Sequence, residues 1–86
     1  MSKQDKLVSV LIQFIENFKA DFEAEKYRVF GLLYADYIIR NEIKITKLLR
    51  EAKHPQKYVS EISRGLHLKK YVTIKSEVLK KHYINP

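Results

Sequence analysis

Cationic side chains crowd the C-terminal part of this chain, and their type and spacing point to a chemistry of anion binding. Residues 53–86 hold eight Lys and Arg against two acids, whereas residues 1–52 hold nine against eight. The last 34 residues therefore carry +6 of the net charge of +7. Such a block attracts polyanions, namely nucleic-acid phosphates, an anionic membrane surface or an acidic protein.

The cations recur at helical spacing near the end of the chain. Apolar residues three and four apart predict a last helix from residue 69 or 70 to about 83, with a basic stripe on its outer face. Lysines on that stripe would neutralise phosphates, while Thr73 and Ser76 would reach base edges. The β-branched run at residues 72–74 leaves a short hairpin through residues 66–74 as the competing local structure. The predicted nucleic-acid-binding residues are Lys53, Lys57, Arg64, Lys69, Lys70, Thr73, Lys75, Ser76, Lys80 and Lys81.

The elements that precede this helix predict a helix-turn-helix arrangement. Pro55 ends one helix and suits the first turn of the next, over residues 55–64, and Gly65 suits a left-handed helix cap. Two helices that hold a third upright are what a helix-turn-helix requires, and residues 54–83 match that architecture. The usual twenty-residue template, laid on residues 58–78 with Gly65 as the turn glycine, fits imperfectly. It places Glu61 and Arg64 where small or apolar residues are expected.

The N-terminal half predicts the hydrophobic core. Ser2 and Asp5 have the spacing of a capping box, and the apolar stripe behind them predicts a helix over about residues 4–23. Residues 24–52 continue the helical period, and one long helix is favoured over two helices that a break at Asn41 would separate. Residues 32–39 are apolar almost all round, which predicts that this helix is buried on several sides and that the chain forms a homodimer.

Several classes of function find no support in the sequence. The chain has no cysteine, and His54, His67 and His82 lie 13 and 15 residues apart, which matches no helical ligand pair and no zinc-finger spacing. We see no glycine-rich phosphate loop and no Ser/His/Asp constellation, so we expect no metal, no cofactor and no enzymatic activity. We also expect no transmembrane helix and no signal peptide, and therefore a cytoplasmic protein.

Together these patterns predict one small all-α domain of three or four helices. Residues 1–52 would supply the core and dimerisation helices, and residues 53–86 a basic, helix-turn-helix-like half that binds nucleic acid, DNA rather than RNA. The expected role is regulation of transcription or replication. The alternative is a non-enzymatic protein-binding module, such as an inhibitor, immunity protein or adaptor, whose basic face docks an acidic partner or a membrane surface.

Overall fold

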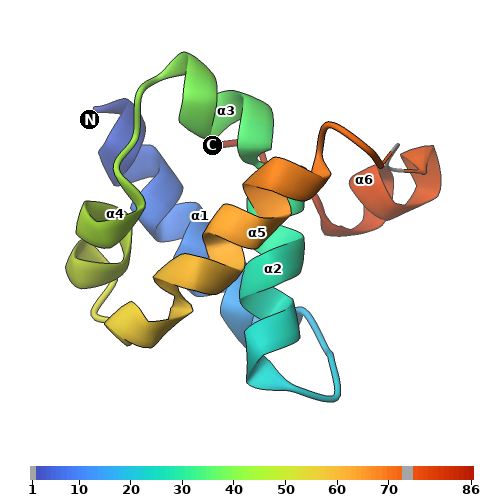
Figure 1. The fold of residues 1–86 in the computed structure, drawn as a ribbon, viewed down its shortest axis with the longest axis horizontal. Coiled ribbons are helices and arrows are strands. Elements are labelled where there is room, and N and C mark those ends of the chain that lie inside the picture. Colours follow the sequence, from blue (N-terminus) through green and yellow to red (C-terminus); the bar gives the residue numbers. More distant parts are fainter. Residues whose placement is uncertain (1, 73–74) are drawn as a thin grey trace.

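Helices make up the regular structure of residues 2–72 and 75–86, which are the residues that this computed structural model describes (Figure 1). In chain order they are α1 (Lys3–Asn17), α2 (Glu23–Leu33), α3 (Ala35–Arg40), α4 (Ile45–Glu51), the 3₁₀ turn η1 (Gln56–Tyr58), α5 (Val59–Leu68) and α6 (Ser76–His82). The all-α prediction is confirmed, with more and shorter helices than the three or four expected. Of the competing hairpin over residues 66–74, residues 66–71 form helix and turn instead of a strand, and residues 73–74 lie outside the described residues. No described helix is long and apolar enough to cross a membrane.

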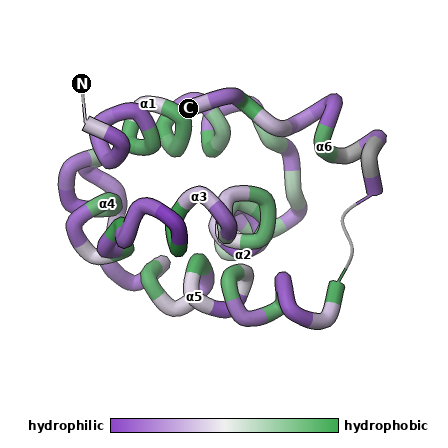
Figure 2. Tube along the Cα trace, turned by 90° about the horizontal axis from the view of Figure 1, so that it is seen from above, coloured by the Kyte–Doolittle hydropathy of each residue, from purple (hydrophilic) through white to green (hydrophobic). Residues whose placement is uncertain are grey.

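The helix α2 lies at the centre, between α1 and α5 (Figure 2). The helix α4 closes the arrangement, because it packs against both α1 and α5. Side chains from all of these elements meet in a single core, in which each large apolar side chain removed from water stabilises the fold by roughly 1.5–3 kcal/mol. The largest fully buried side chains are Tyr34, Phe14, Phe30, Leu7, Leu11, Leu48, Leu49 and Ile62.

The first helix begins as predicted and ends earlier than predicted. The Ser2 side chain accepts a hydrogen bond from the Asp5 amide (3.0 Å), and the Asp5 carboxylate accepts one from the Ser2 amide (3.4 Å), which confirms the capping box. The helix ends at Asn17, six residues before the predicted end. Phe18 adopts an extended backbone that lets its ring stack on Phe14, with 5.0 Å between the ring centroids.

The single long helix over residues 24–52 was the wrong prediction, and the break at Asn41 is confirmed. The chain leaves the helical geometry at Tyr34 and again after Arg40. The second break is a Schellman motif, in which the Ile43 amide donates to the Ile38 carbonyl (3.0 Å) and the Glu42 amide to the Ile39 carbonyl (3.2 Å). Glu42 takes the left-handed conformation there, with φ 52°. The break turns Ile43 into the core, where it is buried.

The apolar segment over residues 32–39, which motivated the dimer, is largely covered within one chain. Leu33, Tyr34 and Ile38 are buried, whereas Ile39 remains exposed. These buried side chains belong to the single core, and the returning C-terminal segment packs on Tyr34, so they do not need a second subunit. The homodimer stays a prediction.

The C-terminal segment returns to the core after α6. The Tyr34 hydroxyl donates to the Ile84 carbonyl (3.0 Å) and accepts from the Ile84 amide (2.6 Å), and the Tyr83 ring stacks on Tyr34. The last residues then share a surface depression with residues of α1, and Figure 2 shows the C-terminus beside α1. The C-terminal segment is therefore part of the packed fold and holds the end of α6 against it.

Candidate nucleic-acid interface

The helix-turn-helix is formed by α4, a turn at residues 52–55, and the continuous element η1 and α5. This is one helix earlier in the chain than predicted, and it straddles residue 52, so the expected core half contributes its first helix. Three interactions hold the turn. The Gln56 side chain donates to the Thr46 carbonyl (3.0 Å), the His54 ring lies 2.9 Å from the Tyr27 hydroxyl, and the Tyr58 ring stacks on Tyr27 at 4.0 Å.

The residue that makes the turn possible is Lys53. Its φ is 60°, its amide donates to the Arg50 carbonyl (3.1 Å), and the following His54 amide donates to the Leu49 carbonyl (2.9 Å). This is again a Schellman motif, and its left-handed position usually holds glycine. The prediction of Gly65 as the left-handed cap was therefore wrong. Gly65 lies inside α5, and the helix continues past it to Leu68.

Gly65 serves helix packing instead of chain reversal. A Cβ atom on Gly65 would overlap the Arg28 carbonyl oxygen and would lie 2.6 Å from the Leu32 amide nitrogen. A Cβ atom on Gly31 would likewise overlap the Ile62 carbonyl oxygen. Both glycines are needed because the backbones of α2 and α5 touch at this point, which seats α5 firmly on the central helix.

The outer face of η1 and α5 is polar and basic. Lys57, Ser60, Arg64 and His67 are exposed, and their spacing of three, four and three residues places them on one side of the helix. Tyr58, Ile62 and Leu66 face the core on the other side. The helix that follows the turn thus presents a cationic, hydrogen-bonding stripe to solvent, as a recognition helix does.

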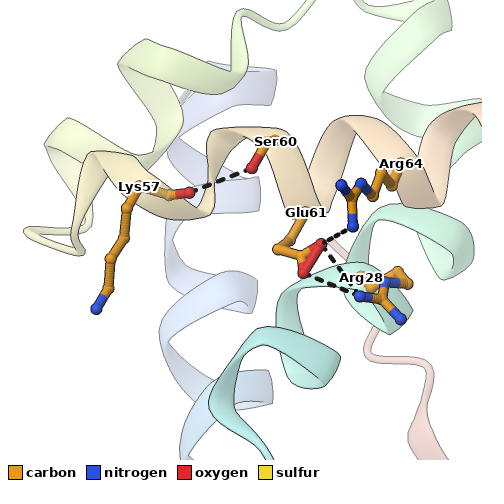
Figure 3. A network of polar contacts seen from close by, with 5 residues as sticks. All are labelled: Arg28, Lys57, Ser60, Glu61 and Arg64. Carbon is orange, nitrogen blue, oxygen red and sulfur yellow. Dashed lines mark hydrogen bonds and ion pairs between the residues drawn. The ribbon is translucent and has the colours of Figure 1, made fainter.

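A carboxylate between two arginines adjoins this stripe (Figure 3). Glu61 is buried, and both of its oxygens accept hydrogen bonds from Nη2 of Arg28, at 3.2 and 3.0 Å. Nη1 of Arg64 lies 3.4 Å from the same carboxylate. Glu61 is the one acid in α5, and its charge is balanced twice over, so it does not make the outer face anionic.

The predicted cationic site residues fall into three groups. Lys53, Lys57 and Arg64 belong to the turn and to the outer face that follows it. Lys69 and Lys70 lie in the turns that end α5. The third group of cations, at the far end of the chain, lies on or next to α6, which Figure 1 shows beyond the C-terminal end of α5. These residues are Lys75, Lys80 and Lys81.

The predicted last helix from residue 69 or 70 to 83 was wrong, because α6 begins only at Ser76. Residues 69–71 form turns, so Lys69 and Lys70 share no helical stripe with Lys80. Lys69 is half-buried beside Asp36 and Arg40. Thr73 lies outside the described residues, and so does the side chain of Ser76.

The sequence reading missed Ser60 and Arg28 as members of this surface. Ser60 could have been found from the spacing of Lys57, Ser60, Arg64 and His67, had the helix been extended past Gly65. Arg28 carries no such signal. It comes from α2, and only the contact at Gly31 and Gly65 brings it beside α5.

The histidines lie apart from one another, in different elements. His54 is in the turn, His67 is on α5 with Nδ1 2.8 Å from the Ser63 carbonyl, and His82 packs edge-on against Phe18. No three His, Asp or Glu side chains within residues 2–72 and 75–86 gather closely enough to hold a metal ion.

Burial shifts the pKa of both partners in the hydrogen bond at the turn. Burial, reinforced by the nearby Tyr58 and Glu23, raises the pKa of Tyr27 to about 12. Burial lowers the pKa of His54, against the opposing pull of Glu16 and Glu23. A neutral imidazole can accept the Tyr27 proton at Nδ1, whereas the protonated ring can only donate. The turn is therefore built around an uncharged His54.

Comparison with known proteins agrees with this geometry. No curated protein and no solved structure matches the chain. The model of the family described as HTH-like domain matches residues 3–75, a span that contains α1 to α5 and the turn between α4 and α5. This match supports DNA binding at the level of the domain. The chain belongs to the HTH-like domain family.

Proposed function

We propose that this protein binds duplex DNA with η1 and α5 as the recognition helix, which enters the major groove. The observation that supports it most directly is the exposed stripe of Lys57, Ser60, Arg64 and His67 directly after the turn. In helix-turn-helix proteins the N-terminal residues of the second helix contact base edges. Lys57 and Ser60 are therefore the proposed base contacts, since a lysine suits guanine and a serine hydroxyl either donates or accepts.

The remaining cations are proposed to contact the backbone. Lys53 flanks the start of the recognition helix, Lys69 and Lys70 flank its end, and α6 adds a separate basic segment with Lys75, Lys80 and Lys81. Neutralisation of roughly six phosphates would give a log–log slope of binding against salt near −5. Thr73 and Ser76 remain predicted contacts.

A fluorescence anisotropy titration with labelled duplex tests this proposal. The chain should bind generic duplex in about 50 mM salt and release it by a few hundred mM, because phosphate contacts dominate such affinity. Lys57→Ala and Ser60→Ala should weaken binding, whereas Lys3→Ala, at an exposed lysine of α1, should leave it unchanged. Failure to bind any duplex at low salt would refute the proposal.

The proposed biological role is regulation of transcription or replication in the cytoplasm. A homodimer would pair two recognition helices with two half-sites. Selection of duplexes from a random library tests both ideas, since a dimer should enrich inverted repeats. Sedimentation that finds only monomer at tens of micromolar would rule out a stable dimer in free solution.

A second function, docking to an acidic protein partner, draws on a different observation. Leu68, Tyr71 and Val72 are exposed at the end of α5, and Tyr71 is 84% exposed. Apolar side chains flanked by cations suit a partner with acidic and apolar groups. This function gains support if the chain binds neither duplex nor single strand at low salt.

A further inference from the structure

The side chains of Arg28, Glu61 and Arg64 form a network that DNA binding by α5 alone does not require. Glu61 lies in the proposed recognition helix with its side chain 11% exposed, between the side chains of Arg28, which is 39% exposed, and Arg64, which is 68% exposed. A carboxylate next to DNA repels phosphates, so an acid at this position calls for a physical reason. The ion pairs supply one, because the carboxylate accepts hydrogen bonds from both arginines and favours the orientations in which they reach it (Figure 3).

Both arginines keep hydrogen-bond donors that Glu61 does not use. Arg28 reaches Glu61 through Nη2, and its Nη1 makes no hydrogen bond within the described part of the chain. Arg64 reaches Glu61 through Nη1, which leaves Nη2. Guanidinium groups present five N–H donors in a planar fork that suits phosphate oxygens.

The two guanidinium groups are neighbours, because Nη2 of Arg28 and Nη1 of Arg64 both bind Oε1 of Glu61, and a surface depression of about 310 Å³ adjoins them. Its lining consists of Arg28, Arg64, His67, Leu68 and Tyr71. The surface of this depression is almost entirely apolar, so it suits the sugar ring of a nucleotide, while the free arginine donors lie outside its lining. The Tyr71 hydroxyl adds a further group of the kind that contacts phosphate.

We propose that Arg28 and Arg64 clamp one backbone phosphate of bound DNA, and that Glu61 is the positioning residue for both guanidinium groups. This inference rests on the proposed function and extends the interface beyond the helix-turn-helix, to a residue of α2. The clamp carries two positive charges against one negative, so it remains attractive to a phosphate. Its arginines are already oriented, so less side-chain freedom is lost when the phosphate binds.

Arg28→Gln tests the phosphate contact through the salt dependence of duplex binding. Loss of one neutralised phosphate should reduce the log–log slope by about 0.9 and weaken binding about equally on different duplex sequences. We expect a loss of about ten-fold in 100 mM salt, in line with a charge-assisted hydrogen bond. Arg28→Lys should leave the salt slope unchanged and lower the affinity for duplex DNA, since an ammonium group cannot bind phosphate through a planar fork. Lys3→Gln, at an exposed lysine of α1 away from the proposed interface, should change neither the salt slope nor the affinity.

Glu61→Gln tests the positioning role, because the two explanations predict opposite changes in affinity for duplex DNA. Removal of a negative charge near DNA by itself tightens binding, whereas loss of the residue that orients two arginines weakens it. The clamp therefore predicts several-fold weaker binding by Glu61→Gln. Thermal melting shows whether this variant is folded, and Arg28→Gln decides the question on its own if it is not.

Two results would overturn the clamp while duplex binding by the unaltered chain stands. One is an unchanged salt slope in Arg28→Gln, and the other is tighter binding by a folded Glu61→Gln. Absence of duplex binding by the unaltered chain would refute the proposed function itself, and the clamp with it.

Discussion

Gly31 of α2 and Gly65 of α5 lie backbone to backbone where these helices cross. A Cβ atom on Gly65 would lie 2.9 Å from the Gly31 carbonyl carbon, closer than side chains tolerate. This contact sets the distance between the central helix and the proposed recognition helix. It also brings Arg28 beside Glu61, so the geometry of the proposed phosphate clamp depends on two residues that have no side chain.

Gly65→Ala should destabilise the protein, although alanine favours helices. The added methyl group meets backbone atoms, which cannot rotate away, and overpacking of this kind costs about 1–3 kcal/mol. The gain in helix propensity is only about 1 kcal/mol. Because about 1 kcal/mol shifts the Tm of a domain this size by about 4–8 °C, we expect a decrease of roughly 5–10 °C in thermal denaturation.

Ser60→Ala is the matched control on the same helix. Ser60 is exposed, so its replacement should leave the Tm within a few degrees of the unaltered chain. A Gly65→Ala variant as stable as this control would show that α2 and α5 do not touch.

Tyr34→Phe should detach the C-terminal segment. The hydroxyl both donates to and accepts from Ile84, and its loss leaves two backbone groups without that partner. Leaving part-buried backbone groups without a hydrogen-bond partner lowers the free energy of unfolding by about 1–3 kcal/mol. Urea denaturation should show a lower midpoint. Tyr37→Phe removes a single exposed hydrogen bond to the Lys3 carbonyl (2.9 Å) and should cost less. Equal midpoints in both variants would contradict the docking of the segment.

Lys53→Gly should stabilise the protein, and Lys53→Ala should not. A left-handed conformation costs an L-residue about 1–2 kcal/mol, whereas glycine adopts it readily. Glycine loses more backbone entropy on folding, and once this cost is subtracted we expect the free energy of unfolding to rise by about 0.5–1 kcal/mol. Both variants lose the same charge, so their affinities for duplex DNA should fall alike while their melting temperatures differ. Identical melting temperatures would argue against the left-handed turn.

Acidification below pH 6.5 should destabilise the protein through His54. Burial depresses the pKa of His54 in the folded state, so the unfolded chain binds a proton more readily. The stability that the neutral ring contributes is thus present above about pH 6.5, its ordinary pKa, and is lost as the pH falls through the depressed value. The Tm of the unaltered chain should therefore fall more between pH 7 and pH 5 than the Tm of His54→Gln. Parallel pH profiles of the two proteins would contradict this assignment.

Local sequence signals predicted the features that local physics controls. The capping box at Ser2 and Asp5, the amphipathic first helix and the end of a helix before Pro55 each depend on residues close together in the chain. The uneven distribution of charge was equally informative, because it is visible in the sequence without knowledge of the fold. The all-α class and a basic, helix-turn-helix-like C-terminal half followed from these signals.

Tertiary structure decided where the turn falls and which side chains share a surface. Glycine was expected at the left-handed turn, but Glu42 and Lys53 take that conformation, while Gly31 and Gly65 allow two helices to touch. The residue type limits the backbone conformations that a position can adopt, and packing determines which of these conformations it takes. For the same reason Arg28 of α2 lies beside Glu61 of α5 only because these two helices touch at Gly31 and Gly65.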